Sequence, residues 1–239
     1  MAYIVNGSSG AAATPTGTGY RHVTSGIEDA AASTAAQVAA DLAAAGAVTP
    51  DLAAGTVTDT GASVGAAGGG SFVVVIAATA MDGDRSQVVL AWPLDRGDPW
   101  EIRARIAFAD AGAGTRVAEI GILQSDATVL KAQVDATYGG QVRHGTEPTL
   151  GGGTGIGSWT GPPGATEIFL RLRGDGSRLE CSWSTDEISW SCVADEHVST
   201  ARSSSGTPPM WSLRANAFTG GAASAESTVT IDEIVLRPS

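Results

Sequence analysis

Apolar and polar residues alternate along several segments of the chain. The segment from Trp100 reads WEIRARIAF, in which every second residue is apolar and most residues between them are charged. The segments EIFLRLR, from Glu167, and WSLRANAF, from Trp211, repeat this pattern. A period of two is typical of a β-strand that buries one of its faces. These segments therefore predict half-buried strands.

The segment VTIDEIVL near the C-terminus changes phase partway along. Val229 and Ile231 are in one phase of the alternation, and Ile234 and Leu236 are in the other. An extra residue in one strand of a pair produces such a phase change. We therefore expect a β-bulge at residues 232–233 that brings both apolar pairs to one face.

Further apolar runs predict strands at residues 72–79, 87–92, 116–124 and 128–135. Glycine-rich turns separate the runs, and no second helical pattern follows them. About ten short strands with such turns are typical of an all-β sandwich or barrel. The pattern therefore predicts an all-β fold for most of the chain.

Residues 1–67 are too poor in large apolar side chains to form a core of their own. Their only aromatic residues are Tyr3 and Tyr20, whereas all six tryptophans and all four phenylalanines follow residue 70. A segment of this composition cannot bury enough surface to offset the entropy of ordering it. We expect residues 1–67 to serve attachment or oligomerisation, with a flexible glycine-rich joint at residues 65–70 and a β domain at residues 68–239.

An alanine-rich stretch within the N-terminal segment predicts one α-helix. It begins at Ser25, a suitable N-cap with Glu28 three positions later, and ends before Gly46. A stripe of small and apolar residues follows one face: Ile27, Ala31, Thr34, Val38, Leu42 and Ala45. The stripe is too thin to anchor a lone helix, so we expect packing against copies of the same helix. The alternative is that this helix docks on the protein's own β domain.

The acidic character of the chain limits its partners. The net charge is −11, and Lys131 is the only lysine. Nucleic acids and anionic membranes are bound through clustered basic residues, so neither is an expected partner. No apolar run approaches the ~20 residues that span a bilayer, and the first residues lack the features of a Sec signal peptide. The two cysteines form no CxxC motif, and we expect no cofactor.

The stretch SWSTDEISWSC predicts a symmetric β-hairpin. With the turn centred between residues 186 and 187, Cys181 lies opposite Cys192 and Trp183 lies opposite Trp190. We expect the tryptophans to form a wall of the core, with an exposed aromatic platform as the alternative. The cysteines are either bridged or two free thiols, and a bulged turn would break their pairing.

Four segments resemble the concanavalin A-like jelly-roll domains. LECSWSTDEISWSCV resembles their signature hairpin, PWEIRARIAF an early core strand, VAEIGILQSD the strand after it and ESTVTIDEIVLRP the closing strand. The resemblance covers residues 71–238 and implies an antiparallel jelly-roll β-sandwich, although Glu187 stands where the family often has glycine. The family includes carbohydrate-binding modules, glycoside hydrolases and passive structural domains, so the resemblance implies a fold but no single function.

The N-terminal segment carries a second resemblance. GTGYRHVTSGIEDAAA, residues 17–32, is similar to segments of tail-fibre and minor structural proteins of tailed bacteriophages. This resemblance implies a virion protein, a fibre or spike subunit on tail or capsid. Its partners would be copies of itself, most commonly in a trimer, other virion proteins and host surface polysaccharide. The alternative is a monomeric carbohydrate-binding module of a bacterial extracellular system.

The sequence contains no recognisable catalytic motif. A hydrolase on a jelly-roll fold would place two or three carboxylates on one strand, in an ExDxxE-like spacing. The acids within the strand patterns are instead single, and we expect them to face solvent: Glu101, Glu119, Glu167 and Glu180. A GxSxG nucleophile elbow is also absent. We therefore expect a protein that is not an enzyme, with a glycan hydrolase of unrecognised site as the weaker alternative.

The longest candidate binding loop spans residues 138–164 and is rich in glycine. It contains Trp159, whose ring suits the apolar face of a sugar. Arg143 and His144 would bind sugar hydroxyls beside it, and Tyr138 is a further aromatic candidate. The alternative is that Trp159 folds back onto the core or a neighbouring subunit.

Overall fold

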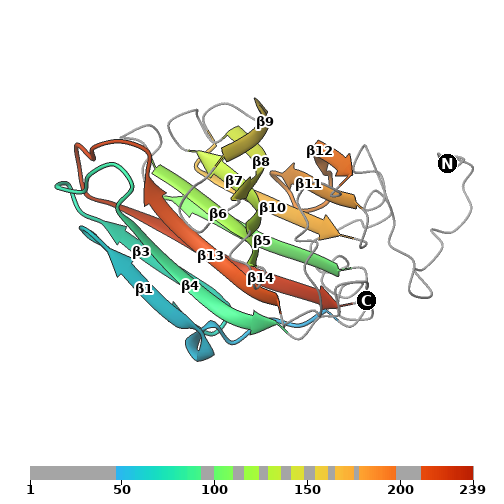
Figure 1. Ribbon diagram of the computed structural model, residues 1–239, viewed down its shortest axis with the longest axis horizontal. Helices are drawn as coiled ribbons and strands as arrows, with labels where there is room; N and C mark the ends of the chain where they lie inside the picture. The colour runs from blue at the N-terminus through green and yellow to red at the C-terminus, as the bar shows by residue number, and fades with distance from the viewer. Residues whose placement is uncertain are drawn as a thin grey trace, which may run out of the picture.

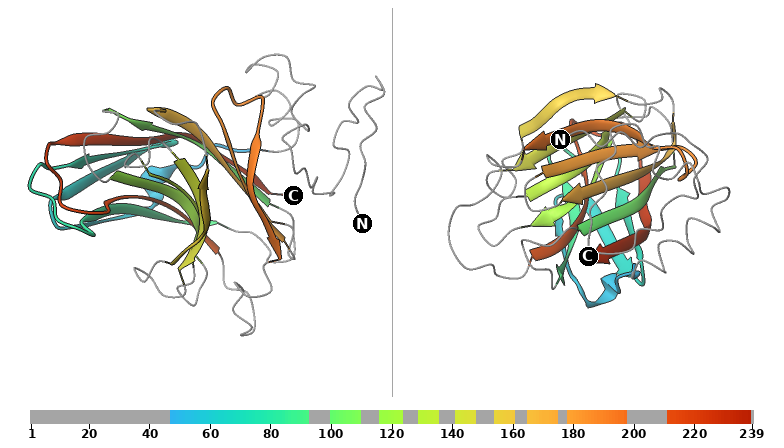
Figure 2. Two further views of the ribbon diagram at one scale, coloured as in Figure 1. Left: turned by 90° about the horizontal axis from the view of Figure 1, so that it is seen from above. Right: turned by 90° about the vertical axis from the view of Figure 1, so that its right-hand side faces the viewer.

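The structure, a computed structural model, is a sandwich of two antiparallel β-sheets (Figures 1 and 2). It describes residues 47–92, 100–109, 116–123, 129–135, 141–147, 154–160, 165–174, 178–197 and 211–238. Over these ranges the only helix is the 3₁₀ turn η2 (Leu52–Ala54), and no helix could span a membrane. The α-helix predicted from Ser25 lies outside the described residues.

Each sheet has seven strands. Sheet 1 has the order β1 (Thr56–Thr60), β4 (Arg85–Trp92), β13 (Trp211–Thr219), β6 (Arg116–Leu123), β7 (Val129–Asp135), β8 (Gln141–Glu147) and β9 (Thr154–Thr160). Sheet 2 has the order β12 (Ser191–His197), β11 (Arg178–Ser184), β10 (Glu167–Gly174), β5 (Trp100–Phe108), β14 (Ser227–Pro238), β3 (Ser71–Ile76) and β2 (Ser63–Gly68). The chain crosses between the sheets several times, so strands distant in sequence become neighbours.

The core lies between the sheets and consists of the apolar residues predicted from the alternation. Ile102 and Ile106 of β5 pair with Leu172 and Ile168 of β10 on the inner face of sheet 2, and all four are buried. Leu213 of β13 pairs with Ile122 of β6 on the inner face of sheet 1. The prediction of an all-β sandwich is therefore confirmed.

The β-bulge predicted in the last strand is confirmed. The pairing of β14 with β5 shifts register between Asp232 and Val235, and Glu233 adopts a left-handed backbone with φ 49°. Arg105 of β5 holds the bulge, since its Nε and Nη2 donate to the Asp232 carboxylate at 2.8 and 2.7 Å. This hydrogen bonding with Asp232 raises the pKa of Arg105 above its ordinary value. Ile234 reaches the core as a result.

The flexible joint predicted at residues 65–70 is wrong. These residues form most of β2 and a tight turn into β3, with Gly69 left-handed at φ 54°. Leu52 is fully buried in the core, and Val48 forms a β-bridge with Leu236. The sandwich therefore begins N-terminal to residue 68, and the expected boundary falls within the β2–β3 hairpin.

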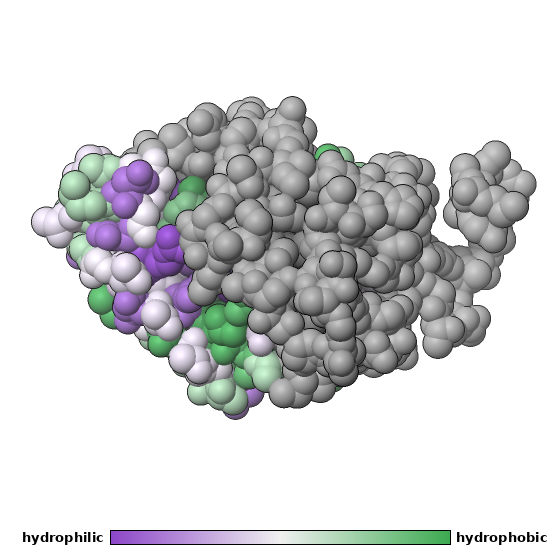
Figure 3. Space-filling model, viewed as in Figure 1, coloured by the Kyte–Doolittle hydropathy of each residue, from purple (hydrophilic) through white to green (hydrophobic). Residues whose placement is uncertain are grey.

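The described surface mixes polar and apolar residues. In Figure 3 hydrophilic and hydrophobic side chains lie side by side at the end formed by the turns after β3 and β13. Among the residues whose side chains the structure describes, the exposed large apolar ones are Val48, Val64, Val73, Val75 and Met81. Four of the five are valines, whereas the leucine, isoleucine and phenylalanine side chains of the described core are buried.

We predict that Gly65→Ala destabilises the protein and that Gly68→Ala in the same strand does not. A Cβ at residue 65 would lie 2.7 Å from the ring of Phe72 and 2.9 Å from Cβ of Ser86, both fully buried, whereas one at residue 68 meets nothing. Overpacking of this kind costs about 1–3 kcal/mol. Urea unfolding of both variants measures the difference, and equal stabilities would contradict the packing of β2 on β3.

Candidate functional site

The hairpin of β11 and β12 is closed by an ordered turn at residues 185–190. Asp186 accepts hydrogen bonds from the backbone N–H groups of Ser189 at 2.7 Å and Ile188 at 2.9 Å, which hold its pKa below the ordinary value. The Ser184 hydroxyl accepts from the N–H of Glu187 at 2.8 Å. Glu187 is left-handed at φ 61°, which explains why glycine suits this position in the jelly-roll family.

The predicted register of this hairpin is wrong. Trp183 pairs with Ser191, and a shift between Cys181 and Ser182 places Cys181 opposite Ala194. The turn is longer than predicted, so Trp190 belongs to the turn instead of facing Trp183. Cys181 and Cys192 are not joined by a disulfide, and burial raises the pKa of Cys181 well above its ordinary value.

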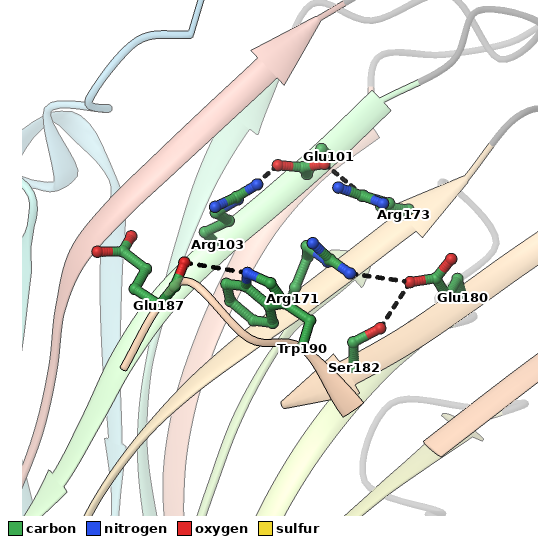
Figure 4. Close-up of polar contacts among 8 residues, drawn as sticks. All are labelled: Glu101, Arg103, Arg171, Arg173, Glu180, Ser182, Glu187 and Trp190. Atoms are coloured by element: carbon green, nitrogen blue, oxygen red, sulfur yellow. Dashed lines mark hydrogen bonds and ion pairs between the residues drawn. The ribbon is translucent and has the colours of Figure 1, made fainter. Parts of the chain in front are cut away.

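Trp190 covers the outer face of sheet 2 and lies over two arginines (Figure 4). Its ring centroid is 4.3 Å from Cζ of Arg171 and 5.0 Å from Cζ of Arg103. Its Nε1 donates to the carbonyl of Glu187 at 3.1 Å, and the residue is 2% exposed. Trp183 is instead half-buried against the core. The two tryptophans therefore form walls on opposite faces of sheet 2.

A cluster of paired charges lies beside and beneath Trp190 (Figure 4). Glu101 of β5 accepts from Nε of Arg103 at 2.6 Å and also from Nε of Arg173. On the next strands, Nη2 of Arg171 lies 3.3 Å from Oε1 of Glu180. Register explains the pairing, because Arg173 of β10 is opposite both Glu101 and Glu180. Acid, base and acid therefore follow one another along this row across β5, β10 and β11.

The expectation that single strand acids face solvent is wrong for three of the four. Glu101, Glu119 and Glu180 are at most 4% exposed, whereas Glu167 is exposed. The alternation identified the residues that face away from the core. It could not show that these residues are nevertheless buried, or that arginines on neighbouring strands neutralise the acids.

The cluster under Trp190 is suited to holding the hairpin more than to catalysis. Each of its charged side chains has an opposite charge as partner within the cluster. The Ser182 hydroxyl donates to Glu180 at 2.6 Å and completes the network. Within the described ranges, no group of three His, Cys, Asp or Glu residues could hold a metal ion. The cluster therefore anchors the turn on sheet 2.

The residues predicted to bind sugar lie on two strands instead of one long loop. Arg143 and His144 belong to β8, and Trp159 belongs to β9, the edge strand of sheet 1. Tyr138 lies outside the described residues. Val142 pairs with Thr160 and His144 with Ile156, so the single residue Arg143 faces the stretch that contains Trp159. Bulges of this kind are common beside binding sites. The backbone thus brings Arg143 and Trp159 to one place, which is the candidate site.

Solved structures with a similar fold include carbohydrate-binding domains. No protein-family model and no curated protein matches the sequence. A functionally unknown protein from Saccharomyces cerevisiae has 15% identity and a TM-score of 0.54, covering 80% of this chain and 99% of its own. The CBM2 module of the evolved Dit of Lactobacillus casei BL23 phage J-1 has 11% identity and a TM-score of 0.51, covering 73% and 79%. The carbohydrate recognition domain of Emp46p has 11% identity and a TM-score of 0.50, covering 79% and 94%.

The likeness to these structures is one of fold. The strand order, the two seven-stranded sheets and these neighbours define a concanavalin A-like β-sandwich, the fold that the hairpin and core-strand segments predicted. Because a fold hosts many activities, the function is argued from the site.

We predict that Glu101→Gln destabilises the protein by about 3 kcal/mol, because it leaves two buried guanidiniums without their shared carboxylate. The control is Glu233→Gln, whose side chain is 52% exposed and pairs with Arg105, and its effect should stay within about 0.5 kcal/mol. Urea unfolding measures both. A similar small effect for the two variants would show that the buried cluster is not needed to hold sheet 2.

Proposed function

We propose that this protein is a structural component of a tailed-phage particle whose β-sandwich binds polysaccharide on the host surface. The observation that carries the proposal is the bulge of β9, which sets Arg143 against the stretch containing Trp159 at the edge of sheet 1. An aromatic ring beside hydrogen-bonding side chains suits a sugar, which has apolar faces and a rim of hydroxyls. The fold shared with a carbohydrate-binding module of a phage protein supports it.

The proposed role is binding without catalysis. A glycoside hydrolase needs one carboxyl group that donates a proton and a second that acts as base or nucleophile. Glu101 instead accepts hydrogen bonds from two arginines and is 4% exposed. Glu119 and Glu180 each lie 3.3 Å from an arginine nitrogen. These acids are arranged for structural pairing, which favours a non-catalytic module.

Affinity electrophoresis of the full chain tests polysaccharide binding, in gels that contain dextran, mannan, laminarin, galactan, alginate or polygalacturonate. We expect retardation by at least one polymer, and Trp159→Ala should raise its dissociation constant at least tenfold, about 1.4 kcal/mol. Thr154→Ala, in the same strand but away from the bulge, is the control. Unretarded migration of the natural chain in all six gels would refute the binding role.

The virion role predicts self-association through the alanine-rich stripe. We expect the full chain to form a discrete oligomer in light scattering, and the double variant Val38→Asp and Leu42→Asp to be a monomer, because charges on the stripe prevent close helix packing. Gln37→Asp, beside the stripe, should leave the oligomer intact. A natural chain that is monomeric and binds glycan would instead indicate a free-standing bacterial carbohydrate-binding module.

A further inference from the structure

Three exposed valines gather on the outer face of sheet 2. Val73 and Val75 of β3 are 36% and 40% exposed, whereas Val74 between them is fully buried in the core. Val64 of β2 is 62% exposed and lies opposite Val75. Because paired residues of neighbouring strands share one face, these valines form one apolar surface at the side of the sheet that ends in β2.

The strand register extends this surface over four strands with uncharged side chains. Val75 pairs with Thr228 of β14. Val73 pairs with Thr230 of β14, and Thr230 pairs with Ala107 of β5. The threonines and Ala107 are half-buried, and Ala66 of β2, which pairs with Val73, is exposed. We call these seven residues the valine patch: Val64, Ala66, Val73, Val75, Ala107, Thr228 and Thr230.

Charged residues border the valine patch. Glu167 of β10 pairs with Ala107, and Arg105 of β5 lies two positions before Ala107 and pairs with Asp232. The side chains of Glu167, Arg105 and Asp232 are 50%, 29% and 19% exposed. An apolar centre with a polar, solvent-accessible rim is the usual arrangement of a protein–protein interface. The patch is therefore suited to contact with a protein surface.

The face of sheet 2 is more accessible to a partner than the edge of β2. The N–H of Gly65 in β2 donates to Oδ1 of Asp59 in β1 at 2.9 Å, and the Ser86 hydroxyl donates to the same oxygen. A strand added at this edge would find that N–H group already bonded. Sheets also pack face to face through their side chains, at a separation of about 10 Å. We therefore expect a partner to pack on the face.

The described chain begins on the same outer face as the valine patch. Ala47 belongs to a small apolar cluster with Ile188 of the hairpin turn and Val235 of β14. Val235 pairs with Arg103, which lies on the outer face in the charge cluster. From Val235 to Thr230, β14 advances by about 16 Å. The patch and the point where the chain enters the sandwich are thus neighbours on one face.

We propose that the valine patch packs against the valine patch of a second copy of this chain. The net charge of −11 makes two copies repel each other where charged surfaces meet, and an uncharged face avoids this repulsion. The patch spans three strand spacings, about 14 Å, so it is smaller than the roughly 800 Å² that each partner buries in a standard interface. It therefore reinforces an oligomer that is held together elsewhere. The inference rests on the self-association proposed above, which would bring the sandwiches to an effective concentration on the order of millimolar.

Sedimentation velocity of the full chain over a dilution series measures the concentration at which the oligomer half dissociates. The double variant Val73→Glu and Val75→Glu should raise this midpoint at least tenfold, because it brings carboxylates of two copies together. The matched control is Thr56→Glu and Thr58→Glu, which adds the same charges at two exposed β-branched residues of β1 in sheet 1. Its midpoint should equal that of the natural chain. Circular dichroism and urea unfolding confirm that each variant is folded.

The outcomes separate this contact from the self-association on which it rests. A natural chain that is monomeric at every concentration refutes the proposed self-association, and the contact with it. If the natural chain is an oligomer and the folded Val73→Glu and Val75→Glu variant dissociates at the same midpoint, the patch is not the contact and the self-association stands. An equal effect of the control variant overturns the patch as well, because the cause is then general charge repulsion. If the patch variant fails to fold, an unchanged midpoint for Val64→Glu overturns the contact.

Discussion

The outer face of sheet 2 depends on the ion pairing of Glu101 with Arg103 and Arg173. Burying a charge is costly unless an opposite charge and hydrogen bonds accompany it. Here the register of β5, β10 and β11 places acid, base and acid on one row, so each strand neutralises the next. With these charges paired, the guanidiniums of Arg103 and Arg171 support the ring of Trp190. The ring in turn holds the turn at residues 185–190 against the sheet. The strand register therefore sets the order of the charges, and the paired charges set the position of the turn.

The same arrangement redistributes charge between the interior and the surface. Among the described residues, five arginines and only three glutamates are buried: Arg103, Arg116, Arg171, Arg173, Arg214, Glu101, Glu119 and Glu180. The buried charges of the described residues are therefore net positive, in contrast to the net charge of −11 of the whole chain. A net charge of −11 opposes long-range attraction to any anionic surface.

The sequence predicted the strands best where large apolar residues alternate with charges, as in β5 and β10, because only one face of such a strand can be buried. The phase change near Asp232 likewise revealed its bulge. Prediction failed where side chains are small: the segment SVGAAG has no apolar period, and its place in the sandwich follows from Phe72 packing against Gly65. The hairpin register failed because the length of its turn is set by Asp186 and Ser184 hydrogen bonds. The residue types of the candidate site were recognisable from the sequence. The pairing of Arg143 with the β9 bulge was not, because it depends on how strands distant in sequence pair.

The bridge between Val48 and Leu236 fixes the place where the described chain enters the sandwich. Two backbone hydrogen bonds, of 2.7 and 2.8 Å, tie the beginning of the described chain to the end of β14. The twelve residues of β14 extend for about 40 Å, and the turns at its other end are tied by the bond from Ala223 N to Ala80 O. The described chain therefore enters the sandwich at the end where β14 finishes, opposite the turns after β3 and β13 (Figure 1).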